Sequence, residues 1–346
     1  MKNNIAELAW ETGDRPAEAP EFTVKVPDET LLQLIEALPD GLLPVTSCKD
    51  IQVSAMFQPR GLVGRYRLDY KGSDSIFIRV TKRIGEPELE SAVIRHLLVN
   101  GVNVNPLLLC GHPAINPDDK ERLRIDASHI IPDAKHFSGQ LSEMEMLGDT
   151  LSKLHHALSK FPLADVVKQN STNRFNRLVK ISDHLKNDPI DAANKLTPFS
   201  SWIISNSSWI NEVSHEISPL SMSKSDDAQC VHGEPHPANV LFTDNKAVLI
   251  DFEESVHLHV SPGWDMAFAV QRFIYADHIK KKSRKNMLAA LCNGYGKEVF
   301  DPLAMREVAW TTLLIIFDLW LEYRIITSTK ECEKFLLLEK QARLLS

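Results

Sequence analysis

The sequence predicts an α+β protein of two lobes, with a small sheet-rich first lobe and a larger, mostly helical second lobe. Short β-favouring runs separated by turn residues are concentrated before Pro132. Apolar residues at helical spacing dominate after Pro132, and one hairpin pattern interrupts them near residue 245. With 346 residues, of which 43% are hydrophobic, the chain is long enough to bury a large core across two lobes.

The first lobe is expected to span residues 25–132, after a loose arm at 1–24 that is acidic and has no clear period. Asp28 is a plausible cap for a helix whose apolar residues recur at the spacing i, i+3, i+4, i+7 and which ends before Pro39. From 53 to 80, β-favouring runs alternate with turn residues such as those at 71–74, which predicts hairpins.

A second helix of this lobe is predicted over residues 85–101, with Gly101 as its C-terminal stop. Its apolar residues share one helical face: Leu89, Val93, Ile94 and Leu97. Strands are expected at about 107–111 and 122–131.

The second lobe is expected to span residues 133–346. The stretches with helical spacing are 142–158, 173–186, 199–216, 265–280, 283–295 and 303–327. One segment differs: residues 239–251 hold two short apolar runs around Asp244 and Asn245, which predicts a hairpin. The cleft between two such lobes is the usual place for a ligand.

Composition narrows the function classes. A net charge of −7 and a pI near 6.0 give no general attraction to nucleic acid or anionic membranes. The five cysteines are scattered singly, which is typical of a reducing compartment without a structural zinc site. The first 22 residues have no basic cluster or apolar stretch, and no later run reaches the length of a membrane span. We therefore expect a cytoplasmic protein, monomeric or homodimeric.

The stretch VHGEPHPANVLF, residues 231–242, carries the strongest chemical signal. It contains an acid, Glu234, and five residues later an amide, Asn239; twelve residues further, after the predicted hairpin, stands Asp251. Phosphoryl transfer needs a base at the attacking hydroxyl and divalent cations on the phosphate oxygens. Carboxylate and amide oxygens are ligands that suit Mg²⁺. The hairpin should bring Asn239 and Asp251 together.

These residues resemble the catalytic-loop and metal-binding motifs of the aminoglycoside phosphotransferase and choline kinase family, small-molecule kinases with a protein-kinase-like fold. The matching residues are His232, Gly233, Glu234, His236, Pro237, Asn239 and the run 249–252. SPGWDMAF, residues 261–268, resembles the family segment whose aspartate, here Asp265, braces the catalytic loop. MLGDTLSKLHHAL, residues 146–158, resembles the family helix that ends in Leu-His.

The resemblance extends into the first lobe and covers roughly residues 50–330. It aligns Arg79 with the strand residue that holds the nucleotide's phosphates, and Glu90 with the helix glutamate that pairs with it. It implies ATP or GTP as the phosphate donor, Mg²⁺ as the cation, and a nucleotide base bound by backbone groups near Ile131. The acceptor would be a hydroxyl of a small molecule, for example an aminoglycoside-like antibiotic, an amino alcohol or a sugar derivative.

Two positions depart from the family pattern. Arg79 stands where lysine is commoner, although its guanidinium can bind phosphate and carboxylate together. Glu234 stands where most such loops carry aspartate, and its extra methylene moves the carboxylate by about 1 Å, a shift that can cost on the order of a hundredfold in rate. Glutamate keeps the acid–base chemistry, and both metal ligands are present, so we expect an active kinase in which Glu234 is the base.

The sequence leaves other interpretations open. The chain could be a catalytically silent pseudokinase that binds nucleotide or serves as a scaffold. A protein kinase is less favoured, because no activation segment with a Pro-Glu ending follows Asp251. Arg79 and Glu90 could form an ordinary ion pair. In the last long helix, Asp318 and Glu322 share a face that either receives ammonium groups beside Trp310 or Trp320, or faces water.

Overall fold

The computed structural model describes residues 24–25, 51–55, 62–70, 75–81, 85–115, 122–276, 279–297, 301–323 and 329–345. The arm expected at 1–24 lies outside these ranges except for Val24, which pairs with Ala55 in a strand. The helix expected after Asp28 and the turn expected at 71–74 also lie outside the described residues.

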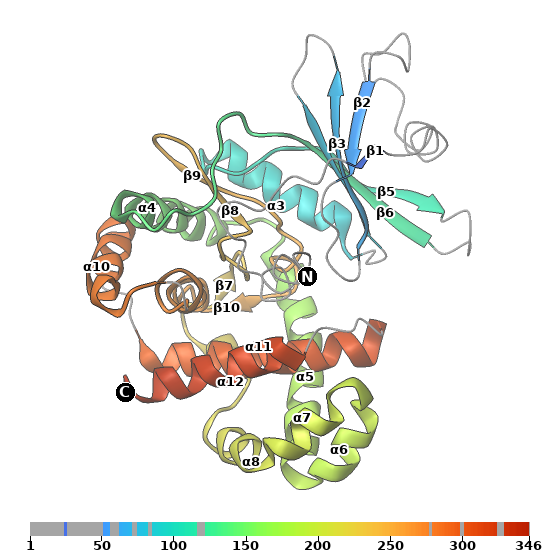
Figure 1. The fold of residues 1–346 in the computed structure, drawn as a ribbon, viewed down its shortest axis with the longest axis vertical. Helices are drawn as coiled ribbons and strands as arrows, with labels where there is room; N and C mark the ends of the chain where they lie inside the picture. Colours follow the sequence, from blue (N-terminus) through green and yellow to red (C-terminus); the bar gives the residue numbers. More distant parts are fainter. Residues whose placement is uncertain are drawn as a thin grey trace.

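Within the described ranges, the first part of the chain forms a six-stranded antiparallel sheet in the order β1-β2-β3-β4-β6-β5 (Figure 1). The strands are β1 (Val24–Lys25), β2 (Ile51–Ala55), β3 (Leu62–Tyr70), β4 (Ile76–Thr81), β5 (Leu107–Ile115) and β6 (Arg122–His129). The hairpins expected between 53 and 80 are confirmed by the pairing of β2, β3 and β4.

The register between β4 and β6 determines which charged residues meet. Ile76, Ile78 and Val80 of β4 are buried on one face, so the alternation of the strand places Arg79 on the other. Arg79 is directly opposite Asp126 of β6. Directly opposite residues in neighbouring strands have side chains in contact, so this register places a cation and an anion side by side.

Helix α3 (Pro87–Val99) packs against β5 and against α4 (Leu141–Leu158), and so joins the sheet to the helical part (Figure 1). Its expected apolar face is buried. Gly101 follows the C-cap residue and has φ of +72°, a left-handed conformation that glycine adopts without steric cost. The predicted end of this helix is therefore confirmed.

The rest of the described chain is mostly helical. Its elements after α4 are α5 (Ala164–Asn187), α6 (Pro189–Lys195), α7 (Ser200–Ser205), α8 (Ser207–Glu216), α9 (Gly263–Ala269), α10 (Arg284–Tyr295), α11 (Pro302–Tyr323) and α12 (Thr329–Arg343). Short 3₁₀ turns lie at Thr197–Phe199, Met222–Lys224 and Lys281–Ser283. In Figure 1, α11 and α12 lie side by side across this part of the molecule.

Three predicted helices differ from the structure. The helix expected at 199–216 is two helices, because the side chain of Asn206 donates to the carbonyl of Trp202 and ends α7 there. The helix expected at 265–280 ends in a π-helical turn, Val270–Ile274. The helix expected from 173 already begins at Ala164, in a polar stretch that hides its period.

The predicted hairpin is confirmed as β8 (Val240–Phe242) and β9 (Ala247–Leu249). Two further short strands, β7 (Gln229–Cys230) and β10 (His259–Val260), precede and follow the hairpin in the sequence and pair with each other. The hairpin is fixed to two other segments by backbone hydrogen bonds: Phe242 exchanges a pair with Lys135, and Leu249 exchanges bonds with Asn103 and Asn105. The candidate site therefore rests on a hairpin whose two strands are held by backbone hydrogen bonds to the segments that follow α3 and β6.

Candidate active site

A buried aspartate holds the loop before the hairpin. Asp265 of α9 accepts hydrogen bonds from the backbone N–H of His232 and of Gly233, both at 2.8 Å, and its side chain is fully buried. His155, near the end of α4, bonds the same carboxylate at 3.0 Å and the hydroxyl of Tyr295 at 2.8 Å. The bracing role that the family resemblance implied for Asp265 is thus visible in the structure.

Glycine is required at position 233. Its φ is +95°, and a Cβ there would lie 2.8 Å from Leu258 Cδ1 and 2.9 Å from the Cβ of Glu254. The carbonyl of Gly233 also accepts a hydrogen bond from the indole of Trp264 at 2.8 Å. The loop therefore takes one conformation, set by the residues beneath it.

The two histidines of the loop shape its backbone. The ring of His232 contacts the carbonyl of Ile250 through Nε2 at 3.1 Å and accepts from the N–H of Glu234 at Nδ1. The ring of His236 accepts from the N–H of Ala238. Burial lowers the pKa of His232, against the opposing charge of Asp265, and lowers the pKa of His236 further. Both rings are neutral at pH 7 and act as anchors.

Asn239 and Asp251 lie at the two ends of the hairpin. The backbone N–H of Ile250 donates to the carbonyl of Asn239 at 3.0 Å, so the two ends are adjacent as expected. The amide nitrogen of Asn239 donates to the carbonyl of Glu234, and this bond orients the amide group of Asn239. Asp251 has φ of +65°, and non-glycine residues held in this conformation are concentrated at functional sites.

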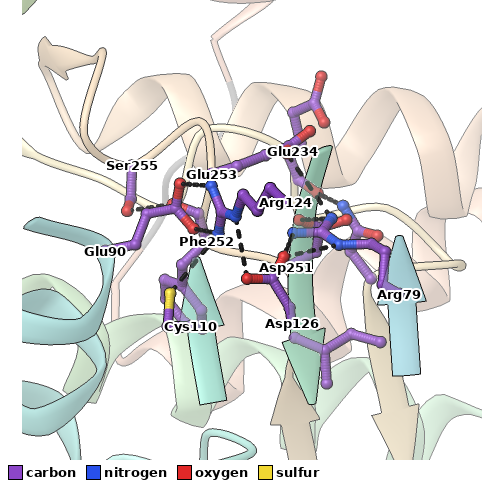
Figure 2. Close-up of polar contacts among 12 residues, drawn as sticks. Arg79, Glu90, Cys110, Arg124, Asp126, Glu234, Asp251, Phe252, Glu253 and Ser255 are labelled. Carbon is purple, nitrogen blue, oxygen red and sulfur yellow. Dashed lines mark hydrogen bonds and ion pairs between the residues drawn. The ribbon is translucent and has the colours of Figure 1, made fainter. Parts of the chain in front are cut away.

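Arg79 connects the sheet to Asp251 (Figure 2). Its Nη1 donates to Oδ1 of Asp251 at 2.9 Å and lies 3.6 Å from a carboxylate oxygen of Glu253. Burial alone would raise the pKa of Asp251, but the charges of Arg79 and Arg65 lower it below its ordinary value. Asp251 is therefore ionised at neutral pH, and 23% of its side chain is exposed.

Glu90 does not pair with Arg79, and the ion pair that the resemblance implied between them is wrong in this structure. Glu90 instead accepts two hydrogen bonds from Arg124 of β6, at 2.7 and 2.5 Å. The reason is the strand register, which sets Asp126 opposite Arg79 and leaves Arg124, on the same face of β6, to reach α3 (Figure 2).

Sequence reasoning missed Arg124, Asp126 and Glu253. A signal was present for the first two: in the predicted strand, an arginine and an aspartate are separated by one isoleucine, which puts both charges on the same face of the strand. Such a pair in a buried strand needs charged partners. Glu253 follows Asp251 by two residues and carried no spacing signal of its own.

Glu234 stands at the centre of the loop and is half-buried. Its N–H donates to His232, and its carbonyl accepts from the N–H of His236 at 2.9 Å and from Asn239 at 3.2 Å. These bonds fix the backbone that carries the Glu234 carboxyl group. Ile131 lies in the segment between β6 and α4, which is tied to β8 through Lys135.

The acidic face of α11 is occupied by a residue of the protein itself. Arg177 of α5 binds both oxygens of Asp318 at 2.9 Å and also binds Glu322 at 2.9 Å. Asp318 is 4% exposed, and Trp310 is fully buried in the core. A ligand ammonium group that bound to these two acids would have to displace Arg177. Trp310 cannot offer its ring face to such a ligand, because it is buried.

A comparison with protein-family models decides the relationship. The model of the phosphotransferase enzyme family, APH, matches residues 90–308, more than half of the chain. The chain belongs to this family. The match includes the braced loop, the hairpin and Asp251, so the predicted family is confirmed. No curated protein is similar enough in sequence to count as a match.

Solved structures share the fold of this APH-family chain. An amicoumacin kinase in complex with AMP-PNP, Ca²⁺ and its ligand is 12% identical, with a TM-score of 0.58 over 92% of this chain and 93% of that one. A spectinomycin phosphotransferase in complex with ADP and spectinomycin is 17% identical, with a TM-score of 0.53 over 84% and 88%. An ethanolamine kinase from Plasmodium vivax is 10% identical, with a TM-score of 0.55 over 84% and 83%. These similarities confirm the two-lobed, protein-kinase-like α+β fold.

No helix among the described residues of this family member is long and apolar enough to cross a membrane.

Proposed function

We propose that this protein transfers the γ-phosphate of ATP or GTP to a hydroxyl of a small molecule. The observation that carries the proposal is the convergence of Glu234, Asn239 and Asp251 on one braced loop and hairpin, with Arg79 reaching Asp251 from the sheet. A decayed site that only served as a scaffold would have no need to keep this arrangement of base, amide, acid and arginine.

The residues at the site suit a divalent cation. Asp251 is ionised, Asn239 offers an amide oxygen, and Glu253 adds a second carboxylate within 3.6 Å of Arg79. Hard oxygen ligands of this kind are those that Mg²⁺ prefers. We propose that Asn239 and Asp251 hold Mg²⁺, which would neutralise negative charge on the phosphate oxygens when bound.

The other site residues would divide the remaining work. Glu234 would accept the proton of the acceptor hydroxyl and orient its oxygen for in-line attack. Arg79 would bind phosphate oxygens, since its pKa is raised well above the ordinary value by Asp251, Glu253 and Asp126 against the effect of burial. Backbone groups near Ile131 would bind the nucleotide base. Glu90 would contribute to the nucleotide site indirectly from α3, through its bonds to Arg124, which in turn bonds Asp126.

For the acceptor, we propose a small hydroxylated molecule such as an aminoglycoside-like antibiotic, an amino alcohol or a sugar derivative. Structures of the same fold include complexes with amicoumacin and with spectinomycin, which supports this size class. A cationic acceptor that used Asp318 and Glu322 would have to compete with Arg177, so this pair is a weak anchor for ammonium groups.

We further propose that residues 25–132 act as the nucleotide-covering lobe and residues 133–346 as the lobe that holds the catalytic loop and the acceptor. The protein would work in the cytoplasm as a monomer or homodimer, without nucleic acid or membrane partners. The net charge of −7 supports the proposed lack of nucleic acid and membrane partners.

Phosphate transfer tests the proposal directly. Purified protein is incubated with Mg²⁺ and γ-labelled ATP or GTP and a panel of aminoglycosides, amino alcohols and amino sugars, and the label is followed by mass spectrometry. We expect label on at least one acceptor with the native protein and none with Asp251→Asn. Tight Mg²⁺-dependent nucleotide binding with no transfer to any acceptor would favour the pseudokinase alternative instead.

A further inference from the structure

Five charged side chains of alternating sign run from α3 through β6 and β4 to the end of the hairpin. We name this the ion-pair chain; its members in order are Glu90, Arg124, Asp126, Arg79 and Asp251, and Figure 2 shows them in contact. The first three are nearly fully buried, with side chains 2–6% exposed. Arg79 is 13% exposed and Asp251 is 23% exposed. The solvent-accessible end of the chain is therefore the end at the proposed metal site.

Asp126 is the most tightly held carboxylate of the ion-pair chain. Its Oδ1 accepts from Nε of Arg124 at 2.9 Å and from the backbone N–H of Gly111 at 2.8 Å. Its Oδ2 accepts from Nε and Nη2 of Arg79 at 3.2 and 3.0 Å. Four donors thus hold one buried carboxylate in a single orientation. Gly111 has φ of +70°, so a special backbone conformation points its N–H at Asp126.

The grip on two nitrogens of Arg79 fixes the plane of its guanidinium group. Because this group is rigid and planar, holding Nε and Nη2 also determines where Nη1 lies. Nη1 lies against Asp251, which is proposed to hold Mg²⁺, and 3.6 Å from Glu253. Without Asp126, Arg79 would keep only the contacts of Nη1 with Asp251 and Glu253, and the plane of its guanidinium group would no longer be fixed.

Glu90 has no direct part in this grip. It bonds Arg124, whose side chain is 2% exposed and cannot reach a ligand. Space around this pair is closed, since a Cβ at Gly85 would lie 2.9 Å from Nη1 of Arg124 and 3.3 Å from Glu90. Among the described residues, Glu90 is connected to Arg79 through Arg124 and Asp126.

We propose that Asp126 is the positioning residue that aims Arg79 at the nucleotide's phosphates, and that Glu90 acts on Arg79 only at second hand. This inference rests on the proposed phosphotransferase function. Arg79 is then positioned by Asp126 of the neighbouring strand, which the register places opposite it, and not by Glu90 of α3.

A thermodynamic cycle tests this assignment. The dissociation constant of the Mg²⁺ complex of a non-hydrolysable ATP or GTP analogue is measured by calorimetry for the native protein, Asp126→Asn, Glu90→Gln, Arg79→Lys and the two double variants that contain Arg79→Lys. Asp126→Asn should weaken binding about tenfold in the native background, as expected for the loss of a charge-assisted hydrogen-bonded pair. It should weaken binding less than about threefold when residue 79 is lysine, because contacting residues are energetically coupled. Glu90→Gln should have the same small effect in both backgrounds.

Two further readouts separate positioning from mere stability. The unfolding temperature of each variant without ligand reports structural damage, and Asp126→Asn should raise the KM for nucleotide while leaving the KM for the acceptor unchanged. If Asp126→Asn folds poorly, Asp126→Glu, which keeps the charge but displaces it, completes the same cycle. Equal effects of the Asp126 substitution in both backgrounds, or coupling of Arg79 with Glu90 instead, would overturn the inference while leaving the proposed function intact. A native protein that binds neither nucleotide would overturn both.

Discussion

Shortening Glu234 by one methylene should cost most of the catalytic rate. The loop cannot move to compensate, because the backbone of residue 234 makes three hydrogen bonds and the preceding residues are anchored on the buried carboxylate of Asp265. Glu234→Asp therefore withdraws the carboxylate by about 1 Å from the acceptor hydroxyl that it is proposed to deprotonate, and a misplacement of that size costs on the order of a hundredfold. This corresponds to about 2.7 kcal/mol of activation free energy.

Glu234→Gln tests the effect of removing the base altogether. Glu234→Gln keeps the length of the side chain but removes the base, so kcat should fall by roughly 10² to 10⁴, the usual contribution of general base catalysis. Steady-state assays of nucleoside diphosphate release measure kcat, and calorimetry measures nucleotide affinity, which both variants should retain because Glu234 is not placed among the phosphate or metal ligands. A Glu234→Gln protein with native kcat would refute the assignment of the base.

Three further outcomes concern the scaffold. Asp265→Asn should lower the free energy of unfolding by about 2–4 kcal/mol, since an amide cannot accept all the backbone hydrogen bonds of a buried carboxylate; thermal denaturation measures this, and an unchanged midpoint would contradict it. Gly148→Ala should cost about 1–3 kcal/mol, because a Cβ there would lie 2.2 Å from the carbonyl oxygen of Leu291 where α4 crosses α10. Gly263→Ala is its control, because the nearest atom to a Cβ at that position is 3.4 Å away; equal losses in both would be unexpected. The pKa of His236 is lowered in the folded protein by burial, so its neutral ring stabilises the fold above about pH 6.5 and this contribution is lost as the pH falls. His236→Gln should therefore reduce the loss of unfolding free energy between pH 7 and pH 5, as measured by urea denaturation at each pH. An equally large loss in the variant and the native protein would count against burial of the neutral ring.

The parts of the site that could be predicted from sequence are those fixed by local geometry. Asn239 and Asp251 are brought together by a tight hairpin, and hairpin register follows from the few residues of its turn. Gly101 was predictable as a helix end because its position after an apolar helical face is a local pattern. The resemblance to a family added Asp265, whose contact with the loop spans more than thirty residues of sequence.

The contacts that prediction missed depend on register between distant segments. Arg79 and Asp126 are 47 residues apart, and whether they meet depends on which residues of β4 and β6 are opposite each other. A shift by one residue would have sent Asp126 to the other face of the sheet. Likewise, no pattern in α11 indicates that Arg177 of another helix covers Asp318. Tertiary placement of charged side chains is therefore where sequence reasoning stops for this protein.

Nucleotide binding that depends on Mg²⁺ and on Asp251 tests the central claim most directly. The unfolding temperature of the native protein and of Asp251→Asn is measured with ATP and with GTP, each with and without Mg²⁺. At a ligand concentration about a hundred times the dissociation constant, binding adds about 2.7 kcal/mol, which for a chain of this size raises the midpoint by roughly 4 °C. We expect a shift with at least one nucleotide that requires Mg²⁺ and is lost in Asp251→Asn. A native protein that shows no shift with either nucleotide, or a shift that the variant retains in full, would contradict this claim.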